Sequence, residues 1–141
     1  MKVLNCSVVF SPSRDRILFC LRTKDPFKGK YNFVGGKVEE GEDHEAAAYR
    51  ELEEETGIGP GQIRLTHFMD LTYYQLDFCL EMYTGVLESE PVLVPEVNPL
   101  VWLDLSEDFT DPDRFAGEQN IAHIINVARH VTEGWKGYSW T

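Results

Sequence analysis

Disulfide-forming cysteines and long apolar runs are both scarce in this sequence. Its cysteines, Cys6, Cys20 and Cys79, are widely spaced, and the sequence contains neither a C-x-x-C pair nor a Cys/His cluster. This pattern excludes a disulfide scaffold and offers no thiolate zinc site, so we expect buried, reduced thiols. The N-terminal residues lack the apolar segment and cleavage site of a signal peptide, and no run is long enough to span a membrane. We therefore expect a cytoplasmic protein.

Positive charge is scarce as well. The chain has 13 Lys and Arg residues against 24 Asp and Glu residues, which gives a formal net charge of −11. A surface this acidic repels polyanions, and this argues against binding to nucleic acid polymers and to anionic membranes. The charges are segregated, because residues 22–37 are rich in Lys and Arg whereas residues 39–55 are rich in Asp and Glu.

The length and composition are those of a chain that folds without disulfide bonds. A chain of 141 residues, of which 43% are hydrophobic, can bury roughly two thirds of its unfolded surface, and we expect a single domain over residues 1–141. Hydrophobic patterns and turn residues predict strands at 3–10, 16–21, 63–68, 71–78, 80–87 and 100–103. They predict helices at 43–56 and 116–132. This order of elements predicts an α/β fold in which a mixed sheet has helices on both faces.

Three glutamates of the first predicted helix lie close to one another. Glu51, Glu54 and Glu55 are three and four residues apart, so their side chains are neighbours spaced by about 5–6 Å. They lie near the C-terminal end of the helix, where the macrodipole disfavours anions, and a cation from outside the chain relieves this repulsion. Several carboxylate oxygens are the ligands that Mg²⁺ and Mn²⁺ prefer. Gly35 and Gly36, before the helix, allow a backbone carbonyl to approach a ligand closely.

The segment at 36–58, GKVEEGEDHEAAAYRELEEETGI, resembles the Nudix box, G-x5-E-x7-R-E-U-x-E-E-x-G-U, in which U is aliphatic. Every defined position matches: Gly36, Glu42, Arg50, Glu51, Leu52, Glu54, Glu55, Gly57 and Ile58. A chance match in a chain of this length is on the order of one in a million or less. The resemblance implies a Nudix α/β/α sandwich, with a mixed β-sheet between helices. It also implies a nucleotide pyrophosphatase that acts on phosphoanhydride bonds.

The resemblance implies roles for individual residues. The ligands of the divalent metal, Mg²⁺ or Mn²⁺, would be four box carboxylates and one backbone carbonyl: Glu51, Glu54, Glu55, Glu42 and Gly36. Arg50 would orient a neighbouring glutamate through charge-assisted hydrogen bonds. A carboxylate takes the proton of the attacking water, and two alternatives for this base stay open, Glu54 and Glu96. Glu96 belongs to a proline-bounded loop downstream of the box.

Residues on both sides of the box bear on the substrate. The segment at 30–37 resembles the corresponding part of MutT-like enzymes. This makes Asn32 a candidate reader of the nucleobase and Lys37, which follows the two glycines, a candidate substrate contact. Relatives that cleave dinucleoside polyphosphates tend to carry a tyrosine 16 to 18 residues after the box, and Tyr74 lies 16 residues after it.

We therefore expect a Mg²⁺-dependent Nudix pyrophosphohydrolase that cleaves a nucleoside diphosphate linked to another moiety. The favoured substrate is a nucleoside triphosphate, as in MutT-like sanitising of the nucleotide pool. Hydrolysis of a dinucleoside polyphosphate or an ADP-sugar is one alternative, and a non-catalytic Nudix-fold nucleotide sensor is another. The intact box favours an enzyme, because such sensors usually have eroded boxes or an added DNA-binding domain. The resemblance also suggests a homodimer.

Overall fold

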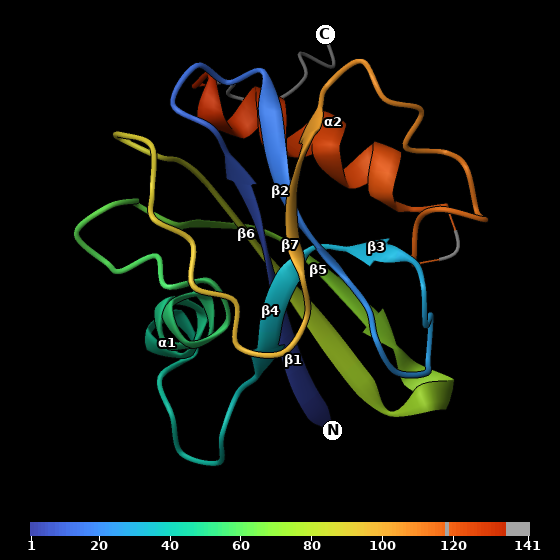
Figure 1. Ribbon diagram of the computed structural model, residues 1–141. Coiled ribbons are helices and arrows are strands. Elements are labelled where there is room, and N and C mark those ends of the chain that lie inside the picture. The colour runs from blue at the N-terminus through green and yellow to red at the C-terminus, as the bar shows by residue number, and fades with distance from the viewer. Residues whose placement is uncertain (118, 135–141) are drawn as a thin grey trace, which may run out of the picture.

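The computed structural model describes residues 1–117 and 119–134, in which seven strands form one sheet (Figure 1). The strands are β1 (Lys2–Phe10), β2 (Arg16–Leu21), β3 (Tyr31–Asn32), β4 (Val34–Lys37), β5 (Thr66–Tyr73), β6 (Phe78–Val86) and β7 (Leu100–Asp104). The helices are α1 (His44–Thr56) and α2 (Ile121–Thr132), and a 3₁₀ turn, η1 (Tyr74–Leu76), lies between β5 and β6.

Strand β1 organises the sheet because it pairs along both of its edges. On one edge it runs parallel to β6, from Lys2 opposite Phe78 to Phe10 opposite Val86. On the other edge it is antiparallel to β4 near its start and to β2 at its end. Strand β5 is antiparallel to β6, and β3 and β7 are both antiparallel to β2. The sheet is therefore mixed, as the order of elements predicts.

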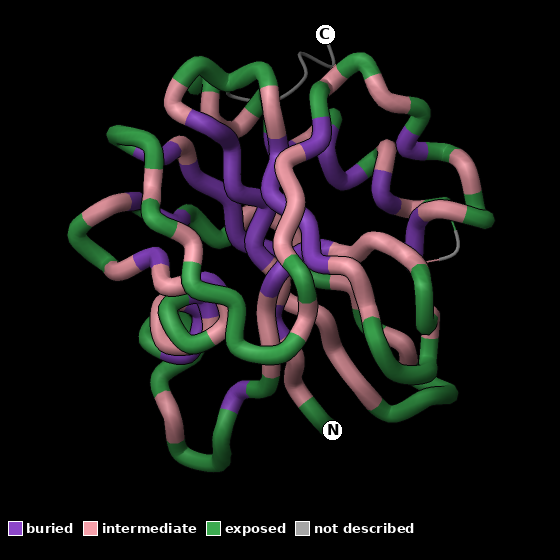
Figure 2. Tube along the Cα trace, in the orientation of Figure 1, coloured by how far each residue is buried: buried purple, intermediate pink, exposed green. Residues whose placement is uncertain are grey.

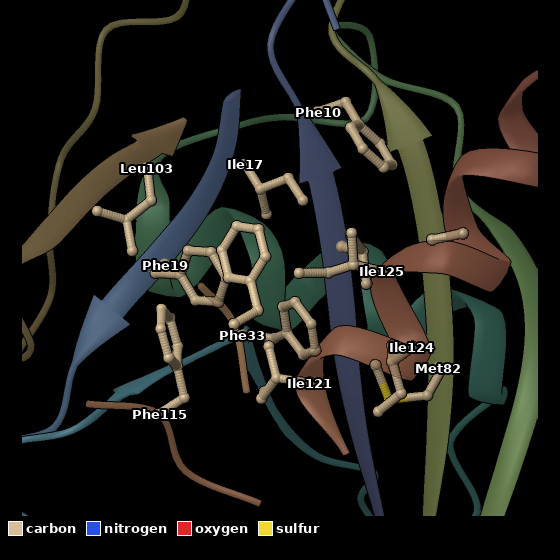
Figure 3. Packing of buried hydrophobic residues seen from close by; sticks show 13 residues of the cluster. Phe10, Ile17, Phe19, Phe33, Met82, Leu103, Phe115, Ile121, Ile124 and Ile125 are labelled. Carbon is tan, nitrogen blue, oxygen red and sulfur yellow. The ribbon is translucent and has the colours of Figure 1, made fainter. Parts of the chain in front are cut away.

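Side chains alternate along the central strands between two hydrophobic cores. Phe10 and Phe19 belong to one core, whereas their neighbours Val9 and Leu18 belong to the other. Helix α2 contributes to the first core and helix α1 to the second, so a helix covers each face of the sheet (Figure 1). Buried residues are concentrated along the central strands in Figure 2. In Figure 3 the Phe19 ring lies beside the Phe33 ring, with centroids 5.3 Å apart. This arrangement confirms the predicted α/β/α sandwich.

Helix α1 has a capping residue at each end. The Asp43 carboxylate caps its N-terminus and accepts a hydrogen bond of 2.9 Å from the Ala46 amide. At the C-terminus Gly57 adopts the left-handed conformation, with φ at 82°, which glycine tolerates best. Ala48 and Leu52 are buried against the sheet, so the glutamates occupy the remaining surface of the helix. The predicted helix is confirmed, with Asp43 as its cap rather than its first residue.

Strands β3 and β4 are missing from the sequence-based expectation. A two-residue strand and a strand that is half glycine carry little strand propensity. Strand β4 forms through the close approach of two backbones, because a Cβ atom at Gly35 would lie 2.1 Å from the Asn5 carbonyl oxygen. Pairing with β1, rather than side-chain preference, therefore makes this segment a strand.

Two expected boundaries are wrong. In place of separate strands at 63–68 and 71–78 the chain forms β5, because a β-bulge after His67 lets one strand continue through Met69 to Tyr73. Helix α2 begins at Ile121 rather than at 116, since Gly117 and Gln119 adopt positive φ of 78° and 76°. Neither described helix, of 13 and 12 residues, has the length and apolar character that crossing a membrane requires.

Candidate active site

Strand β4 seats two glutamates of α1 against the sheet. A Cβ atom at Gly36 would lie 2.1 Å from Glu51 Oε2, so glycine leaves room for this carboxylate. The Gly35 amide donates a hydrogen bond of 2.7 Å to Glu55 Oε2. The Gly36 amide donates to Asn5 Oδ1 at 3.2 Å, which anchors this part of β4 to β1. The two glycines therefore let the Glu51 and Glu55 side chains of α1 lie against β4.

Arg50 gathers three carboxylates around one guanidinium group. Its Nε and Nη2 atoms donate to the two oxygens of Glu42, at 2.7 and 3.0 Å. Its Nη1 atom donates to Glu51 Oε1 and to Glu54 Oε2, both at 3.0 Å. Its Nη2 atom also donates to the Lys37 carbonyl oxygen at 3.0 Å. Arg50 thus holds the box glutamates in place and ties α1 to the end of β4.

These contacts shift the pKa values of the two partners in opposite directions. Hydrogen bonds from Arg50 are the main reason why the pKa of Glu42 falls to about 2, and the Glu39 amide acts in the same direction. The same hydrogen bonds are the main reason why the pKa of Arg50 rises. The Arg50–Glu42 pair is therefore ionised throughout the physiological pH range.

Glu55 lies in a different environment. Burial is the largest of the effects that raise the pKa of Glu55 to about 7, and the charges of Glu51 and Glu96 add to it. Hydrogen bonds from the Gly35 amide and the Cys20 thiol favour the ionised carboxylate and oppose this shift. The charges of Glu51 and Glu96 thus act on Glu55, and a nearby cation lowers the cost of keeping all three carboxylates ionised.

The loop after β6 brings Glu96 to this place. The Val94 amide donates a hydrogen bond of 2.8 Å to the Thr56 carbonyl oxygen, and the Glu96 amide donates one of 3.3 Å to the Glu55 carbonyl oxygen. Both acceptors belong to the last turn of α1, whose carbonyls have no partner within the helix. The hydrogen bonds that close the helix therefore also fix the position of Glu96.

The carboxylates at this place suit a hard divalent cation. Glu51, Glu55 and Glu96 line one cavity, and carboxylate oxygens are the ligands that Mg²⁺ and Mn²⁺ prefer. In the described part of the chain, no three of these acidic groups bring ligand atoms within 4.8 Å of one another. Arg50 draws Glu51 and Glu54 toward itself, and like charges repel. The donor chemistry fits such an ion, while the ligand atoms stand apart.

A cavity of about 1110 Å³ opens beside these glutamates. This volume is slightly above the usual range for small-molecule sites, roughly 300–1,000 Å³. Its apolar lining residues include Phe27, Phe33, Leu80, Met82, Ile121 and Ile124. Polar side chains interrupt this lining: Asn5, Arg22, Asn32, Tyr73, Asn98 and Asn120. Such a cavity can hold a flat ring with polar edges, and its carboxylate end can hold a cation together with an anionic group.

The predicted substrate contacts lie in three different places. Asn32 lines the cavity, and its Oδ1 accepts a hydrogen bond of 2.9 Å from the Phe33 amide. Lys37 is exposed at the end of β4, outside the cavity lining, and its carbonyl oxygen accepts a hydrogen bond from Arg50. Tyr74 lies in η1, is 80% exposed and is also outside the lining, whereas its neighbour Tyr73 belongs to it. The structure thus brings Asn32 to the box glutamates and leaves Lys37 and Tyr74 outside.

Asn5 and Arg22 are among the cavity residues that are absent from the sequence-based site. Asn5 is 2% exposed, and its Nδ2 atom has no hydrogen-bond partner in the described structure. A buried donor without a partner is costly, so a cavity group or ligand that accepts from it is favourable. Arg22 donates from Nε to the Pro26 carbonyl oxygen at 2.6 Å, which fixes its guanidinium at the cavity. The sequence could have pointed to Asn5, because it is a polar residue inside an apolar strand. For Arg22 the only indication in the sequence was its place in the Lys- and Arg-rich segment.

Several known proteins are similar to this chain. A family model described as "NUDIX domain" matches residues 1–124. An oxidized purine nucleoside triphosphate hydrolase of Danio rerio is 32% identical over 117 residues, which cover 75% of this chain and 68% of that protein. An ADP-ribose pyrophosphatase of Methanocaldococcus jannaschii is 48% identical over 46 residues, which cover 33% of this chain and 27% of that protein. The dihydroneopterin triphosphate pyrophosphohydrolase of E. coli has a similar structure, with a TM-score of 0.70 at 22% identity over 91% of this chain and 95% of that one.

Proposed function

Because this chain belongs to the Nudix hydrolase family, we propose that it is a Mg²⁺- or Mn²⁺-dependent pyrophosphohydrolase of a nucleoside triphosphate. The observation that carries the proposal is that Glu51, Glu55 and Glu96 line one cavity large enough for a nucleotide. The relative from Danio rerio is named for purine nucleoside triphosphates, and this supports the same class of substrate here.

The box carboxylates would hold the cation. We assign this role to Glu51, Glu54 and Glu55, with the Gly36 carbonyl and Glu42 contributing. A divalent cation bound there would neutralise the phosphate charges and make the phosphorus atom more electrophilic. The protein's role is to present carboxylate and carbonyl oxygens in a fixed orientation.

Arg50 is a positioning residue in this proposal. Its hydrogen bonds of 3.0 Å hold the carboxylates of Glu51, which lines the cavity, and of Glu54, which lies outside the lining. Two hydrogen bonds to Glu42 fix the Arg50 guanidinium group itself. Glu42 therefore helps to orient the proposed metal ligands indirectly, through Arg50.

Between the two alternatives for the base, Glu96 is favoured over Glu54. Glu96 lines the cavity, whereas Glu54 is half exposed and its carboxylate is held by Arg50. Glu96 would accept a proton from the attacking water, a step that typically contributes about 10²–10⁴-fold to the rate. Glu96→Gln is therefore expected to lower kcat by about that factor with little change in KM. Because Glu54 is also assigned to the metal, a larger loss of kcat in Glu54→Gln than in Glu96→Gln would assign the base to Glu54 only if the Mg²⁺ affinity of Glu54→Gln equals that of the wild type.

The far end of the cavity would receive the nucleoside. The Oδ1 atom of Asn32 is taken by the Phe33 amide, which leaves its Nδ2 atom to donate to a base edge. Phe27 and Phe33 supply apolar surface for the ring, and Arg22 supplies positive charge for a phosphate oxygen.

An ADP-sugar is the second candidate substrate. The local identity of 48% to an ADP-ribose pyrophosphatase favours it. Tyr74 gives no support to a dinucleoside polyphosphate substrate, because it is exposed and lies outside the cavity lining.

A nucleotide panel with product identification tests the proposal. Purified protein with Mg²⁺ is given nucleoside triphosphates, ADP-ribose and dinucleoside polyphosphates. The expected products are a nucleoside monophosphate and pyrophosphate from a triphosphate. Faster release of AMP and ribose 5-phosphate from ADP-ribose would support the second candidate. Tight nucleotide binding by calorimetry without any product would contradict both and indicate a sensor.

A further inference from the structure

A β-bulge in β5 places two metal-ligating side chains on one face of the sheet. The register shifts between His67 and Met69, so Phe68 is an extra residue in the ladder with β6. Residues three apart in a regular strand point to opposite faces, but the extra residue brings His67 and Asp70 to the same face. Their side chains meet, because His67 Nε2 lies 2.6 Å from Asp70 Oδ1.

Strand β6 adds a carboxylate opposite this pair. Asp70 directly faces Glu81 across the two strands, and like charges at opposed positions destabilise a ladder. The ligand atoms of His67, Asp70 and Glu81 all lie within 4.8 Å of one another. In residues 1–117 and 119–134 no other three His, Cys, Asp or Glu side chains come this close. A cation between the two acids would relieve their repulsion.

Helix α1 supplies a second imidazole. Its first residue is His44, and His44 Nδ1 lies 3.0 and 2.9 Å from the two carboxylate oxygens of Glu81. His67 and Asp70 of β5 and Glu81 of β6 thus form a close group, and His44 of α1 joins it through Glu81. We call these four residues the helix–hairpin cluster.

The surroundings of this cluster are negative and open to solvent. The Tyr83 ring lies 5.1 Å from the His67 ring, and burial followed by the charges of four carboxylates, Glu81 first, raises the pKa of Tyr83 to about 12. His44 and His67 line a surface cavity of about 470 Å³, whose lining includes one cation, Arg64. The side chains of His44 and His67 are 51% and 45% exposed. An ion from solvent can therefore reach both imidazoles.

We infer that the helix–hairpin cluster binds a borderline divalent transition metal, Zn²⁺ or the chemically similar Ni²⁺ or Co²⁺. Two imidazole nitrogens with two carboxylates form a ligand set for such ions, whereas Mg²⁺ prefers oxygen alone. Ligands about 2.0–2.2 Å from a tetrahedral Zn²⁺ ion stand about 3.3 Å from one another. In the structure His67 Nε2 and Asp70 Oδ1 are 2.6 Å apart, and the ligand atoms of His67, Asp70 and Glu81 all lie within 4.8 Å of one another. The spacing expected around a Zn²⁺ ion falls between these two distances.

This site is separate from the box glutamates. His44 is the first residue of α1, and Glu51 follows two turns later, about 10 Å along the helix axis. An ion in the cluster would join the start of α1 to the β5–β6 hairpin. It would thereby fix the helix whose other end carries the box glutamates. The consequence is stabilisation of the folded chain by Zn²⁺, which does not depend on nucleotide hydrolysis.

Zn²⁺ itself is the probe that tests this site. The 141-residue chain is stripped with EDTA, dialysed, and titrated with Zn²⁺ in excess Mg²⁺, which competes at the box glutamates. Calorimetry is expected to show one saturable Zn²⁺ ion, and thermal unfolding is expected to move to higher temperature. His67→Ala is expected to weaken binding by at least about 10- to 100-fold, the loss that removing even an outer-shell partner causes. It should also abolish the thermal shift.

Two variants serve as matched controls. His123→Ala removes an exposed imidazole of α2, and Glu51→Gln removes a box carboxylate; both are expected to keep the Zn²⁺ affinity of the wild type. Equal Zn²⁺ affinity in His67→Ala and the wild type would overturn the assignment. So would loss of the ion in Glu51→Gln with retention in His67→Ala. If His67→Ala fails to fold by circular dichroism, His44→Ala and His67→Gln test the same ligands with smaller demands on β5.

Discussion

Replacing Glu55 by Gln tests the electrostatics of the proposed metal site. Glu55 is largely buried beside Glu51 and Glu96, and burial is the main reason why its pKa rises from an ordinary value of 4.5 to about 7. The folded protein therefore holds this proton more tightly than the unfolded chain. This tighter proton binding contributes to the free energy of unfolding. The contribution is fully present below about pH 4.5 and is lost as the pH rises through about 7. A glutamine side chain does not titrate and removes this dependence.

The magnitude follows from the two pKa values. The difference between 4.5 and about 7 corresponds to about 3 kcal/mol at most of unfolding free energy. Most of this change falls between pH 5 and pH 8. The raised pKa of His44 also contributes to the pH dependence, but it does so equally in both proteins and cancels in the comparison.

Urea denaturation in EDTA at pH 5 and pH 8 measures this effect. The unfolding free energy of the wild type is expected to fall by about 2–3 kcal/mol more than that of Glu55→Gln over this range. Glu53→Gln changes an exposed glutamate of the same helix and is expected to behave as the wild type does. Saturating Mg²⁺ should reduce the loss in the wild type, since only the ionised carboxylate binds the ion. Parallel pH dependences of the wild type and Glu55→Gln would refute the reasoning.

Four further changes probe the same network. Gly36→Ala puts a methyl group where the Glu51 carboxylate lies, so hydrolysis is expected to fall at least about 10²-fold while the urea midpoint changes little; a normal rate would contradict the close approach. Arg50→Lys keeps the positive charge but loses the paired hydrogen bonds to Glu42, so kcat is expected to fall about 10- to 100-fold. An unchanged kcat would mean that the guanidinium group has no positioning role. Asn5→Ala leaves the Gly36 amide unpaired and is expected to cost about 1–3 kcal/mol in urea unfolding, and a neutral result would mean that this hydrogen bond is replaced. The lowered pKa of Glu42 stabilises the fold above about pH 4.5 and this stability is lost as the pH falls toward 2, so Glu42→Gln should show a weaker loss of stability on acidification, measured by circular dichroism.

The parts of the molecule that sequence could predict are those specified by neighbouring residues. The cap at Asp43, the left-handed Gly57 and the buried Ala48 and Leu52 lie within one short segment, and they define α1 without reference to the rest of the chain. The spacing of glutamates on that helix likewise follows from helical geometry. Helix α1 and the neighbourhood of its carboxylates were therefore predictable.

Features that depend on distant pairing were not predictable. Asn5 reaches the site because β1 pairs with β4, and Ile121 reaches the same cavity only because α2 covers the sheet from the C-terminal end of the chain. The bulge after His67 leaves no mark in the hydrophobic pattern, so the strand was expected to break there. His44 and Glu81 are 37 residues apart and meet only in the folded chain, and His67 shares a face with Asp70 only because of the bulge.

The turnover of two isosteric variants tests the central claim most directly, namely that the box glutamates of α1 support metal-dependent hydrolysis of a nucleotide. Glu51→Gln and Glu53→Gln differ by two positions on one helix, but Glu51 lines the cavity whereas Glu53 is exposed. With Mg²⁺ and the best nucleotide both saturating, Glu51→Gln is expected to lose at least about 10²-fold in kcat, because a metal ligand contributes to several kcal/mol of transition-state stabilisation. Glu53→Gln is expected to keep the rate of the wild type. Equal rates in the two variants would contradict the account.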